Sequence, residues 1–438
     1  MQGLDSTAVI PALPYITAAY NAPELAAHVL LAAYFIGCGA SLPVVGWACD
    51  RYGAKRVLMV AISLFVLGSV FSALAPTLSL LTASRFIQGG AAASLIPVAR
   101  VLAVRTVEPR SLLKTITGLT TPPMIGQTVG PAIGGWLAQM DQWRLIFFTG
   151  LPFALTSLII IGFLALDTER EDTDPLDVGA VVLSVAAMGC AVVGLGTLRV
   201  DGPHVGIPIV AILMALTLGT LFVKRNLRAD KPLIDFTIFS DQTFRLSCIG
   251  GMLFRLMVGA TPFLLAYHLQ SVLGLDAFQA GLLITASGAG TLIAKPYTSA
   301  IIQRLGYRNT LLGAGALALM GFIVPAFSTA AWPLAIIAVI LVSASFMRSV
   351  EIVAFGTLGY ADLPKRSASS ISVVSSLVQQ ISHAMGVAIA AGALSVSALY
   401  GAPLAVTSVI GFAAIALLAG FGLISFARLK ACAGSQMV

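Results

Sequence analysis

Charged residues are scarce in this 438-residue chain: Asp, Glu, Lys and Arg make up 10% of the sequence, whereas hydrophobic residues make up 58%. A water-soluble protein of this length has too small an interior to bury so much apolar surface. Apolar stretches recur along the whole chain, and a helix of about 20 such residues crosses a bilayer core. They do not alternate in short segments as the strands of a membrane β-barrel do. The composition therefore predicts an all-α polytopic membrane protein.

Cysteine is equally sparse, and its positions exclude several classes of site. The five cysteines show neither Cys-x-x-Cys nor Cys/His spacing, so neither a disulfide framework nor a metal site is predicted. No nucleophile with a base, no metal-ligand cluster and no phosphate-binding glycine loop can be assembled from the sequence. We therefore expect a protein that is not an enzyme and that holds no cofactor.

The hydropathy pattern predicts about fourteen spans, of which the first is short. Their ranges are 4–20, 28–48, 56–74, 78–103, 112–138, 146–166, 178–198, 206–223, 244–268, 279–301, 310–327, 333–357, 369–396 and 403–427. If both termini face the cytoplasm, most lysines and arginines fall in cytoplasmic segments and only Arg144 and Arg199 lie on the opposite side. The net charge of +7 is then the positive-inside asymmetry of a membrane protein, and binding of nucleic acid is excluded.

Two long hydrophilic connectors, the acidic 167–177 and the basic 224–243, bracket one pair of predicted helices. Residues 50–55 after the second span are echoed by residues 303–308 after the tenth, with Arg, Gly and a final basic residue at the same spacing. Parallel repeats of this kind are a recurrent transporter design. We predict a six-helix bundle at 1–166, a two-helix insertion at 167–243 and a second six-helix bundle at 244–438.

The loop after the second span combines a glycine, an acid, a turn glycine and basic residues, at Gly46, Asp50, Arg51 and Gly53. An acid here can contact a helix N-terminus or pair with an arginine, and such contacts hold one state of a transporter closed. The alternative is a basic loop that only sets the topology.

Arg85 lies deep within the fourth predicted span, and Gln88 follows one turn later. A charge at that depth is costly unless it faces a partner or a hydrated cavity, which makes Arg85 a functional candidate. The alternative is a structural arginine satisfied by backbone carbonyls or by Asp50.

The fifth span carries small residues at four-residue spacing around a proline, at Gly126, Gly130, Pro131 and Gly134. Small residues at this spacing allow close helix contact, and a proline inside a helix favours a kink. A bending element is favoured over ordinary helix packing.

These three segments resemble the three signature motifs of the major facilitator superfamily, and the third resembles the form found in its antiporters. Residues 4–16 are similar to the first-helix signature of the fourteen-spanner drug/proton antiporter family, and residues 143–148 to its entry into span six. Seven later segments resemble a proteobacterial multidrug-efflux branch of that family. They are 254–255, 262–265, 280–283, 295–296, 348–349, 357–364 and 379–380. The resemblance implies two six-helix bundles with two extra central helices, in the bacterial inner membrane. It also implies exchange of protons for a drug-like substrate.

The chain departs from the family pattern in three places. Asp5 stands only four positions after Met1, so it is expected close to the cytoplasmic boundary. Ala54 replaces a basic residue of the first motif, and Glu351 stands where the closest branch has glutamine, so it inherits no family role.

Asp5 and Glu351 are the only two of eighteen carboxylates well inside predicted spans, which makes them the candidates for proton coupling. The resemblance puts Asp5 first, and the alternative for Asp5 is an N-terminal helix cap. Arg348 and Glu351 are three residues apart, so an intrahelical ion pair is the alternative for Glu351.

Four residues of the second half are candidates for the substrate cavity: Arg255, Lys295, Arg348 and His383. Three buried cations make a cavity positive, which favours anionic substrates and opposes a reading in terms of cationic drugs. His383 is able to relay a proton, but hydrogen-bonded packing is the commoner role of a lone intramembrane histidine.

Three functions stay open on the sequence. The first is a monomeric proton-coupled exporter of amphipathic drug-like molecules, driven by the proton gradient and working by alternating access in the lipid bilayer. The second is a dedicated exporter of a metabolite or organic anion. The third is a transport-inactive sensor.

Overall fold

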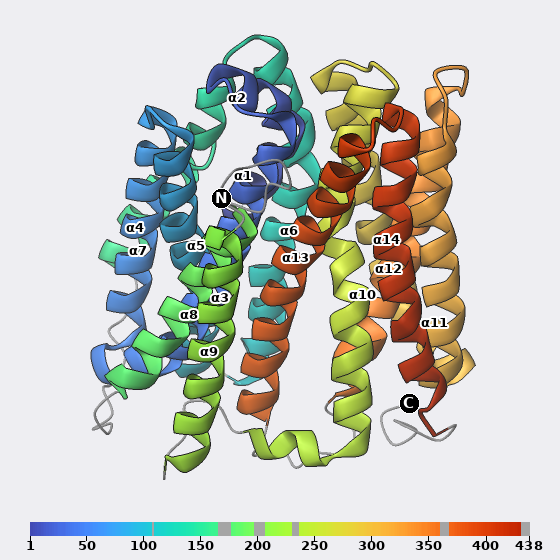
Figure 1. Cartoon of the computed structure of the whole chain (residues 1–438). Helices are drawn as coiled ribbons and strands as arrows, with labels where there is room; N and C mark the ends of the chain where they lie inside the picture. Colours follow the sequence, from blue (N-terminus) through green and yellow to red (C-terminus); the bar gives the residue numbers. More distant parts are fainter. Residues whose placement is uncertain (107–108, 165–176, 197–205, 230–235, 360–367, 431–438) are drawn as a thin grey trace. The chain divides into compact units, whose positions relative to one another are not determined.

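Helices form every regular element in the computed structural model, which describes residues 1–438 except 107–108, 165–176, 197–205, 230–235, 360–367 and 431–438 (Figure 1). Within the described part, eight helices are long and apolar enough to cross a membrane. Large apolar side chains such as Val60, Leu64 and Phe163 are exposed along their outer faces. Such side chains are expected where lipid is the solvent. The predicted all-α polytopic membrane fold is confirmed.

The first predicted span, 4–20, is a broken helix. It consists of α1 (Gln2–Ala8), a 3-10 turn (Ile10–Ala12) and α2 (Leu13–Ala19). Pro11 and Pro14 stand at the first positions of the second and third pieces, where a missing N–H costs least. The prolines thus explain why the chain changes helix type here instead of continuing one regular helix.

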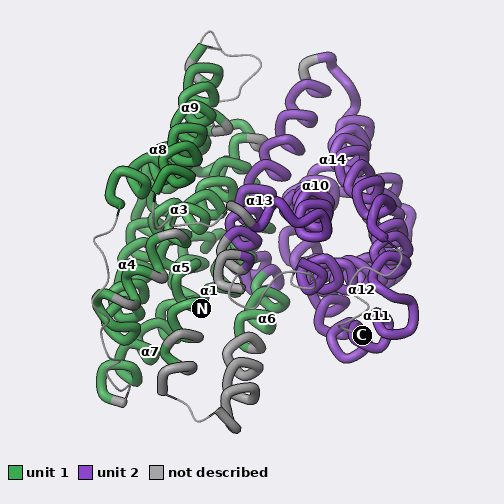
Figure 2. Tube along the Cα trace, turned by 90° about the horizontal axis from the view of Figure 1, so that it is seen from below, with its two compact units in different colours: residues 1–130, 140–198, 203–234 green, residues 131–139, 199–202, 235–438 purple. Residues whose placement is uncertain are grey.

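The first of two compact units holds residues 1–130, 140–198 and 203–234 (Figure 2, green). Its further helices are α3 (His28–Tyr52), α4 (Ala54–Leu74), α5 (Leu78–Thr106), most of α6 (Pro109–Gln139), a 3-10 turn η3 (Trp143–Phe148), α7 (Leu151–Leu164), α8 (Val178–Gly196) and α9 (Gly206–Arg228). Asp177 caps α8 by accepting from the Ala180 N–H at 3.0 Å and holds Arg225 of α9, whose Nε lies 2.9 Å away. An exposed ion pair thus joins α8 to α9.

The second unit holds residues 131–139, 199–202 and 235–438 (Figure 2, purple). Its elements are a 3-10 turn η4 (Phe236–Ser240), α10 (Gln242–Tyr267), a π-helical turn (His268–Val272), α11 (Ala277–Ile323), a 3-10 turn η6 (Val324–Phe327), α12 (Leu334–Leu358), α13 (Ala368–Leu399) and α14 (Leu404–Ala427). Helices α8 and α9 group with the first unit. The three-part division at 1–166, 167–243 and 244–438 stays a prediction.

Helix α11 contains the predicted span 279–301 and most of the predicted span 310–327, and its two helical parts meet at a kink. Gly306 breaks its helical geometry with φ 73° and ψ 162°. Gly53, the matching residue of the loop after α3, has φ 86° and ψ 140°. These left-handed conformations suit glycine. The sequence echo between 50–55 and 303–308 is therefore also an echo in backbone geometry.

Glycines bring α3 and α5 into close backbone contact. A Cβ at Gly37 would overlap the carbonyl of Phe86, and one at Gly89 would overlap the carbonyl of Tyr34. Small residues at a helix crossing allow this approach within a membrane. Gly89 lies one turn after Arg85 on α5, so this crossing also fixes the position of Arg85.

Candidate functional site

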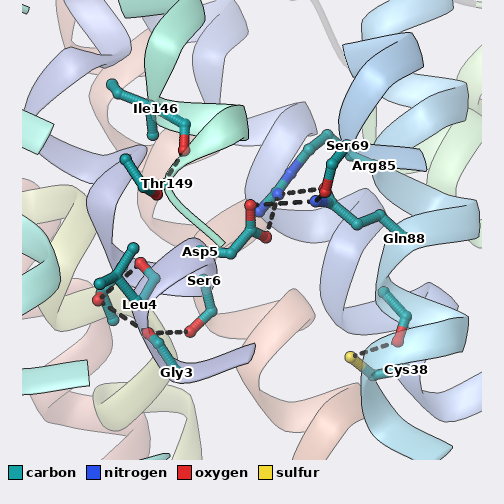
Figure 3. A network of polar contacts seen from close by, with 12 residues as sticks. Gly3, Leu4, Asp5, Ser6, Cys38, Ser69, Arg85, Gln88, Ile146 and Thr149 are labelled. Atoms are coloured by element: carbon teal, nitrogen blue, oxygen red, sulfur yellow. Dashed lines mark hydrogen bonds and ion pairs between the residues drawn. The ribbon is translucent and has the colours of Figure 1, made fainter. Parts of the chain in front are cut away.

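A buried network of charged and polar side chains lies inside the first unit (Figure 3). Arg85 of α5 donates from its NH1 to Oδ2 of Asp5 in α1, at 2.7 Å. Arg85 is 0% exposed and Asp5 is 1% exposed, so water does not screen this ion pair. Two opposite charges at this distance in a dry interior are strongly coupled, and removing either one leaves a costly unpaired charge.

Gln88 and Ser69 extend the network from the second oxygen of the Asp5 carboxylate. Gln88 donates from Nε2 to Oδ1 of Asp5 at 3.0 Å and to Oγ of Ser69 at 2.7 Å, and its Oε1 accepts from NH1 of Arg85 at 2.6 Å. Figure 3 shows Asp5 of α1 pointing toward Arg85 and Gln88 of α5. Both carboxylate oxygens of Asp5 are therefore hydrogen-bonded by side chains of α5.

Aromatic rings surround the rest of the Arg85 guanidinium. Its Cζ lies 4.4 Å from the ring centroid of Tyr34 and 5.8 Å from that of Phe147. Its Nε and NH2 have no hydrogen-bond partner within the described residues. A buried cation over an aromatic ring gains about 0.5–2 kcal/mol, which is less than a lost hydrogen-bonded ion pair. Asp5 therefore contributes most to holding the charge of Arg85.

Close packing on α6 holds α1, and with it Asp5, in place. A Cβ at Gly130 would overlap the Thr7 hydroxyl, and one at Gly126 would lie 3.0 Å from the Leu4 amide nitrogen. Thr7 also donates to the Gln127 carbonyl at 3.1 Å. Gly126 and Gly130 of α6 thus form the surface on which α1, the helix that carries Asp5, packs.

The sequence left alternative roles for Asp5 and Arg85, and the structure tests part of them. Asp5 lies inside α1, which begins at Gln2 after Met1 and has no side-chain cap, so Asp5 is not a helix cap. The partners of Arg85 are Asp5 and Gln88. The side chain of Asp50 lies outside the described residues, so pairing with Asp50 stays untested.

The loop motif is only partly described. The side-chain environments of Gly46 and Asp50 lie outside the description, although both residues are in α3. Arg51 is exposed in the last turn of α3, and Gly53 turns the chain into α4. The predicted latch role of this loop stays a prediction.

The antiporter-type motif straddles the boundary between the units, because residues up to Gly130 group with the first unit and Pro131 onward with the second. A Cβ at Gly281 of α11 would overlap the Pro131 carbonyl. Gly134 is buried on the same helix. Helix α6 runs as one helix through Pro131, so the proline does not end it. Residues on both sides of Pro131 thus serve as close-contact points for different helices, α1 and α11.

In the second unit, Arg348 does not form the alternative ion pair with Glu351. Its NH1 donates to the Thr261 hydroxyl at 3.2 Å and its NH2 to the Ser345 hydroxyl at 3.1 Å. Glu351 is 0% exposed, and neither of its carboxyl oxygens has a hydrogen-bond partner in the described part of the chain. Both oxygens press against Gly315 of α11, where a Cβ would lie 2.5 Å from Oε2. A negative charge on this carboxyl would have no described partner, which is costly in a low-dielectric interior.

The three other cavity candidates differ in their surroundings. Arg255 is 7% exposed, and its guanidinium stacks over the Phe355 ring at 4.6 Å. Lys295 is exposed on α11. His383 is half-buried on α13 and packs its backbone against Gly259 of α10, where a Cβ would overlap it. The structure thus brings Arg255, Arg348 and His383 onto neighbouring helices and leaves Lys295 on an exposed face.

Sequence reasoning did not find several residues that complete these sites. Ser69 and Tyr34 surround Arg85, and Thr261 and Ser345 hold Arg348. Only Ser345 had a usable signal, because it stands three residues before an arginine on one helix face. The others come from distant helices and need the fold.

Comparisons with known proteins find similarity to membrane transporters. A family model described as Major Facilitator Superfamily matches residues 1–387. The chain is 33% identical over 399 residues to "Putative multidrug resistance protein MdtD" of Pectobacterium carotovorum subsp. carotovorum (strain PC1), covering 89% of this chain and 84% of that protein. It is 31% identical over 399 residues to the protein of the same name from Escherichia coli (strain SE11), covering 89% and 83%. A solved structure of an auto inhibited POT family peptide transporter matches with a TM-score of 0.71 at 14% identity, over 98% of this chain and 95% of that one, a likeness of fold alone.

Proposed function

The chain belongs to the major facilitator superfamily, and we propose that it is a proton-coupled antiporter that exports amphipathic drug-like molecules by alternating access. The observation that carries the proposal is the buried Asp5–Arg85 pair. The name multidrug resistance protein of its relatives supports a drug-like substrate. Their bacterial sources support a place in the inner membrane.

Asp5 is the proton carrier in this proposal. Its carboxylate is held by Arg85 and Gln88, so taking up a proton removes the negative charge and breaks the 2.7 Å ion pair. Arg85 is then a buried cation with only hydrogen bonding to Gln88 and contact with aromatic rings. A buried unpaired charge is costly by several kcal/mol, so protonation favours a conformation in which water reaches Arg85.

Helix α6 passes this change on. Asp5 sits on α1, and α1 is locked to α6 by the Thr7–Gln127 hydrogen bond and by the glycines at 126 and 130. A movement of α1 that follows release of Asp5 therefore displaces α6 as well.

Everted membrane vesicles with an acidic lumen test the proposal. The probe is the fluorescent cation rhodamine 6G, and wild-type vesicles are expected to accumulate it until an uncoupler removes the pH gradient. Asp5→Asn should lose this gradient-driven accumulation while still letting the dye equilibrate without a gradient. Asp177→Asn is the matched control, because it makes the same change at a carboxylate that lies on the surface, 30% exposed.

A folding defect is separated from a coupling defect by Asp5→Glu, which keeps the carboxyl and should keep part of the driven accumulation. Accumulation in the Asp5→Asn vesicles at the wild-type rate would remove Asp5 from the mechanism.

A further inference from the structure

Two arginines of the second unit lie in the middle of their spans and have no carboxylate partner among the residues that the structure describes. Arg255 stands in the middle of α10 and is 7% exposed, and its guanidinium stacks over the Phe355 ring. Arg348 stands in the middle of α12 and is half-buried, and its partners are two neutral hydroxyl groups. Cations at this depth are costly unless they are paired or hydrated.

Both arginines face the same seam between α10 and α12. Arg255 of α10 contacts Phe355 of α12, and Thr261 of α10 contacts Arg348 of α12. The contact residues are six positions apart on α10 and seven apart on α12, running in opposite directions. At 1.5 Å per residue the two contacts are about 9–10 Å apart along the seam. Because the guanidinium groups themselves make these two contacts, a ligand that reaches both must be long enough to lie along the seam.

His383 of α13 adds a third nitrogen-bearing side chain next to this seam. Gly259 of α10 packs directly on the His383 backbone, which places α13 against the same stretch of α10. His383 therefore lies on a helix that neighbours the seam.

The described carboxylates of the second unit do not neutralise this region. Asp241 and Asp276 cap α10 and α11 by accepting from the Phe244 and Gln279 amides. Glu351 is enclosed against Gly315 and makes no hydrogen bond to Arg348. The positive charge of the seam thus has no counter-charge in the described part of the unit.

We propose that the seam formed by Arg255 and Arg348 binds an acidic group, a carboxylate or sulfonate, of the molecule that the protein exports. The inference rests on the proposed exporter function and adds amphipathic compounds that carry an acidic group to the drug-like molecules that the protein exports. Guanidinium groups present forked donors that match a planar acid, and the Thr261 and Ser345 hydroxyls are further donors once they rotate.

The surroundings of Arg348 fit such a ligand. A cavity of about 20 Å³ adjoins Arg348, Thr261 and Ser345, which is room for one water-sized atom group such as a carboxylate oxygen. Met257 and Phe322 line the same cavity and offer apolar contact to the body of the ligand. A lipophilic cation meets like charges in this seam, so the site discriminates against it.

Binding of two dyes to the purified detergent-solubilised protein tests the site without requiring transport. Fluorescein and rhodamine 6G share a xanthene body, but fluorescein is an acid and rhodamine 6G a cation, and fluorescence polarisation reports the binding of each. We expect fluorescein to bind more tightly than rhodamine 6G. Arg255→Gln and Arg348→Gln should each weaken fluorescein binding about tenfold or more and leave rhodamine 6G binding unchanged or tighter.

Two further variants separate loss of the site from loss of the fold. Arg348→Lys keeps the charge but loses the fork, so an intermediate affinity is expected. Arg225→Gln, at an exposed arginine of the first unit, should bind fluorescein as the wild type does. The proposal would be overturned if the wild type did not bind fluorescein, or if Arg255→Gln and Arg348→Gln bound it as tightly as the wild type.

The vesicle experiment distinguishes this failure from failure of the exporter function. Accumulation of rhodamine 6G that requires Asp5, without any fluorescein binding, leaves the proton-coupled exporter standing and removes the anion site. Fluorescein binding that requires both arginines, without driven accumulation of either dye, keeps the site and removes the exporter.

Discussion

The sharpest structural prediction concerns the buried pair of Asp5 and Arg85, tested by a double-mutant cycle with Asp5→Asn and Arg85→Gln. Both charges are fully buried and 2.7 Å apart, so each single change leaves the other charge unpaired. Breaking such a pair from one side costs about 3–5 kcal/mol, whereas replacing both partners by neutral groups is often close to neutral. Arg85→Gln also loses contact with the Tyr34 ring, worth about 0.5–2 kcal/mol.

We therefore expect the double variant to be more stable than either single variant, with a coupling of about 3 kcal/mol or more. Unfolding of the purified protein in detergent, followed by the helical circular dichroism signal, measures all four proteins. The exposed pair of Asp177 and Arg225 serves as the control cycle, and no resolved coupling is expected there because solvent screens it. Additive losses for the buried pair, within about 0.5 kcal/mol, would refute the claim that the two charges depend on each other.

Three further predictions follow from single contacts. Gly130→Val should lower the free energy of unfolding by about 1–3 kcal/mol, because the new side chain overlaps α1. Gly219→Val is the control and should not lower it, because a side chain there meets open space. Thermal unfolding compares the two variants. Gly315→Ala should destabilise the wild type by crowding the carboxyl of Glu351, and the loss should shrink in a Glu351→Ala background when the same melts are recorded. The hydrogen bond and charge of its arginine partner lower the pKa of Asp177, so this acid stabilises the fold above its ordinary pKa of about 4 and ceases to do so as the pH falls through the lowered value. Wild-type and Asp177→Asn proteins should therefore differ in unfolding midpoint near neutral pH and converge in strong acid.

The spans were predictable because span length and apolar composition are local properties. Helices such as α4, α12 and α14 begin and end within a few residues of the predicted ranges. Helix α11 shows the limit of this reasoning: both predicted spans are present, but Gly306 joins them without the loop that the charges around it suggested. The division of the first span by Pro11 and Pro14 was readable from proline chemistry, yet hydropathy alone passes over it.

The partners of the charged residues were not predictable, because partner choice is decided by helices far apart in sequence. Asp5 and Arg85 are separated by 80 positions, and their meeting depends on how α1 seats on α6 and how α5 crosses α3. Lys295 looked equivalent to Arg255 in hydropathy, but the faces of their helices differ and Lys295 is exposed. Depth within a span is thus readable from sequence, whereas the direction a side chain faces is not.

Arg85 and Arg348 show how the same local pattern leads to opposite chemistry. Each is a cation in mid-span with a polar residue three positions later, Gln88 in one case and Glu351 in the other. Spacing of three places both members on neighbouring faces of the helix but does not decide whether they bond. Gln88 bonds its arginine because α1 delivers a carboxylate that both can share.

At Arg348 no carboxylate arrives from a neighbouring helix in the described part of the chain, and the side chain bonds Ser345 one turn back instead. Glu351 is thereby left enclosed at Gly315. The hydroxyl groups that hold Arg348 carry no charge, which leaves its guanidinium open to an acidic ligand such as the one proposed above. The pair in the first unit is therefore suited to respond to a proton, and the seam in the second unit to respond to an acid.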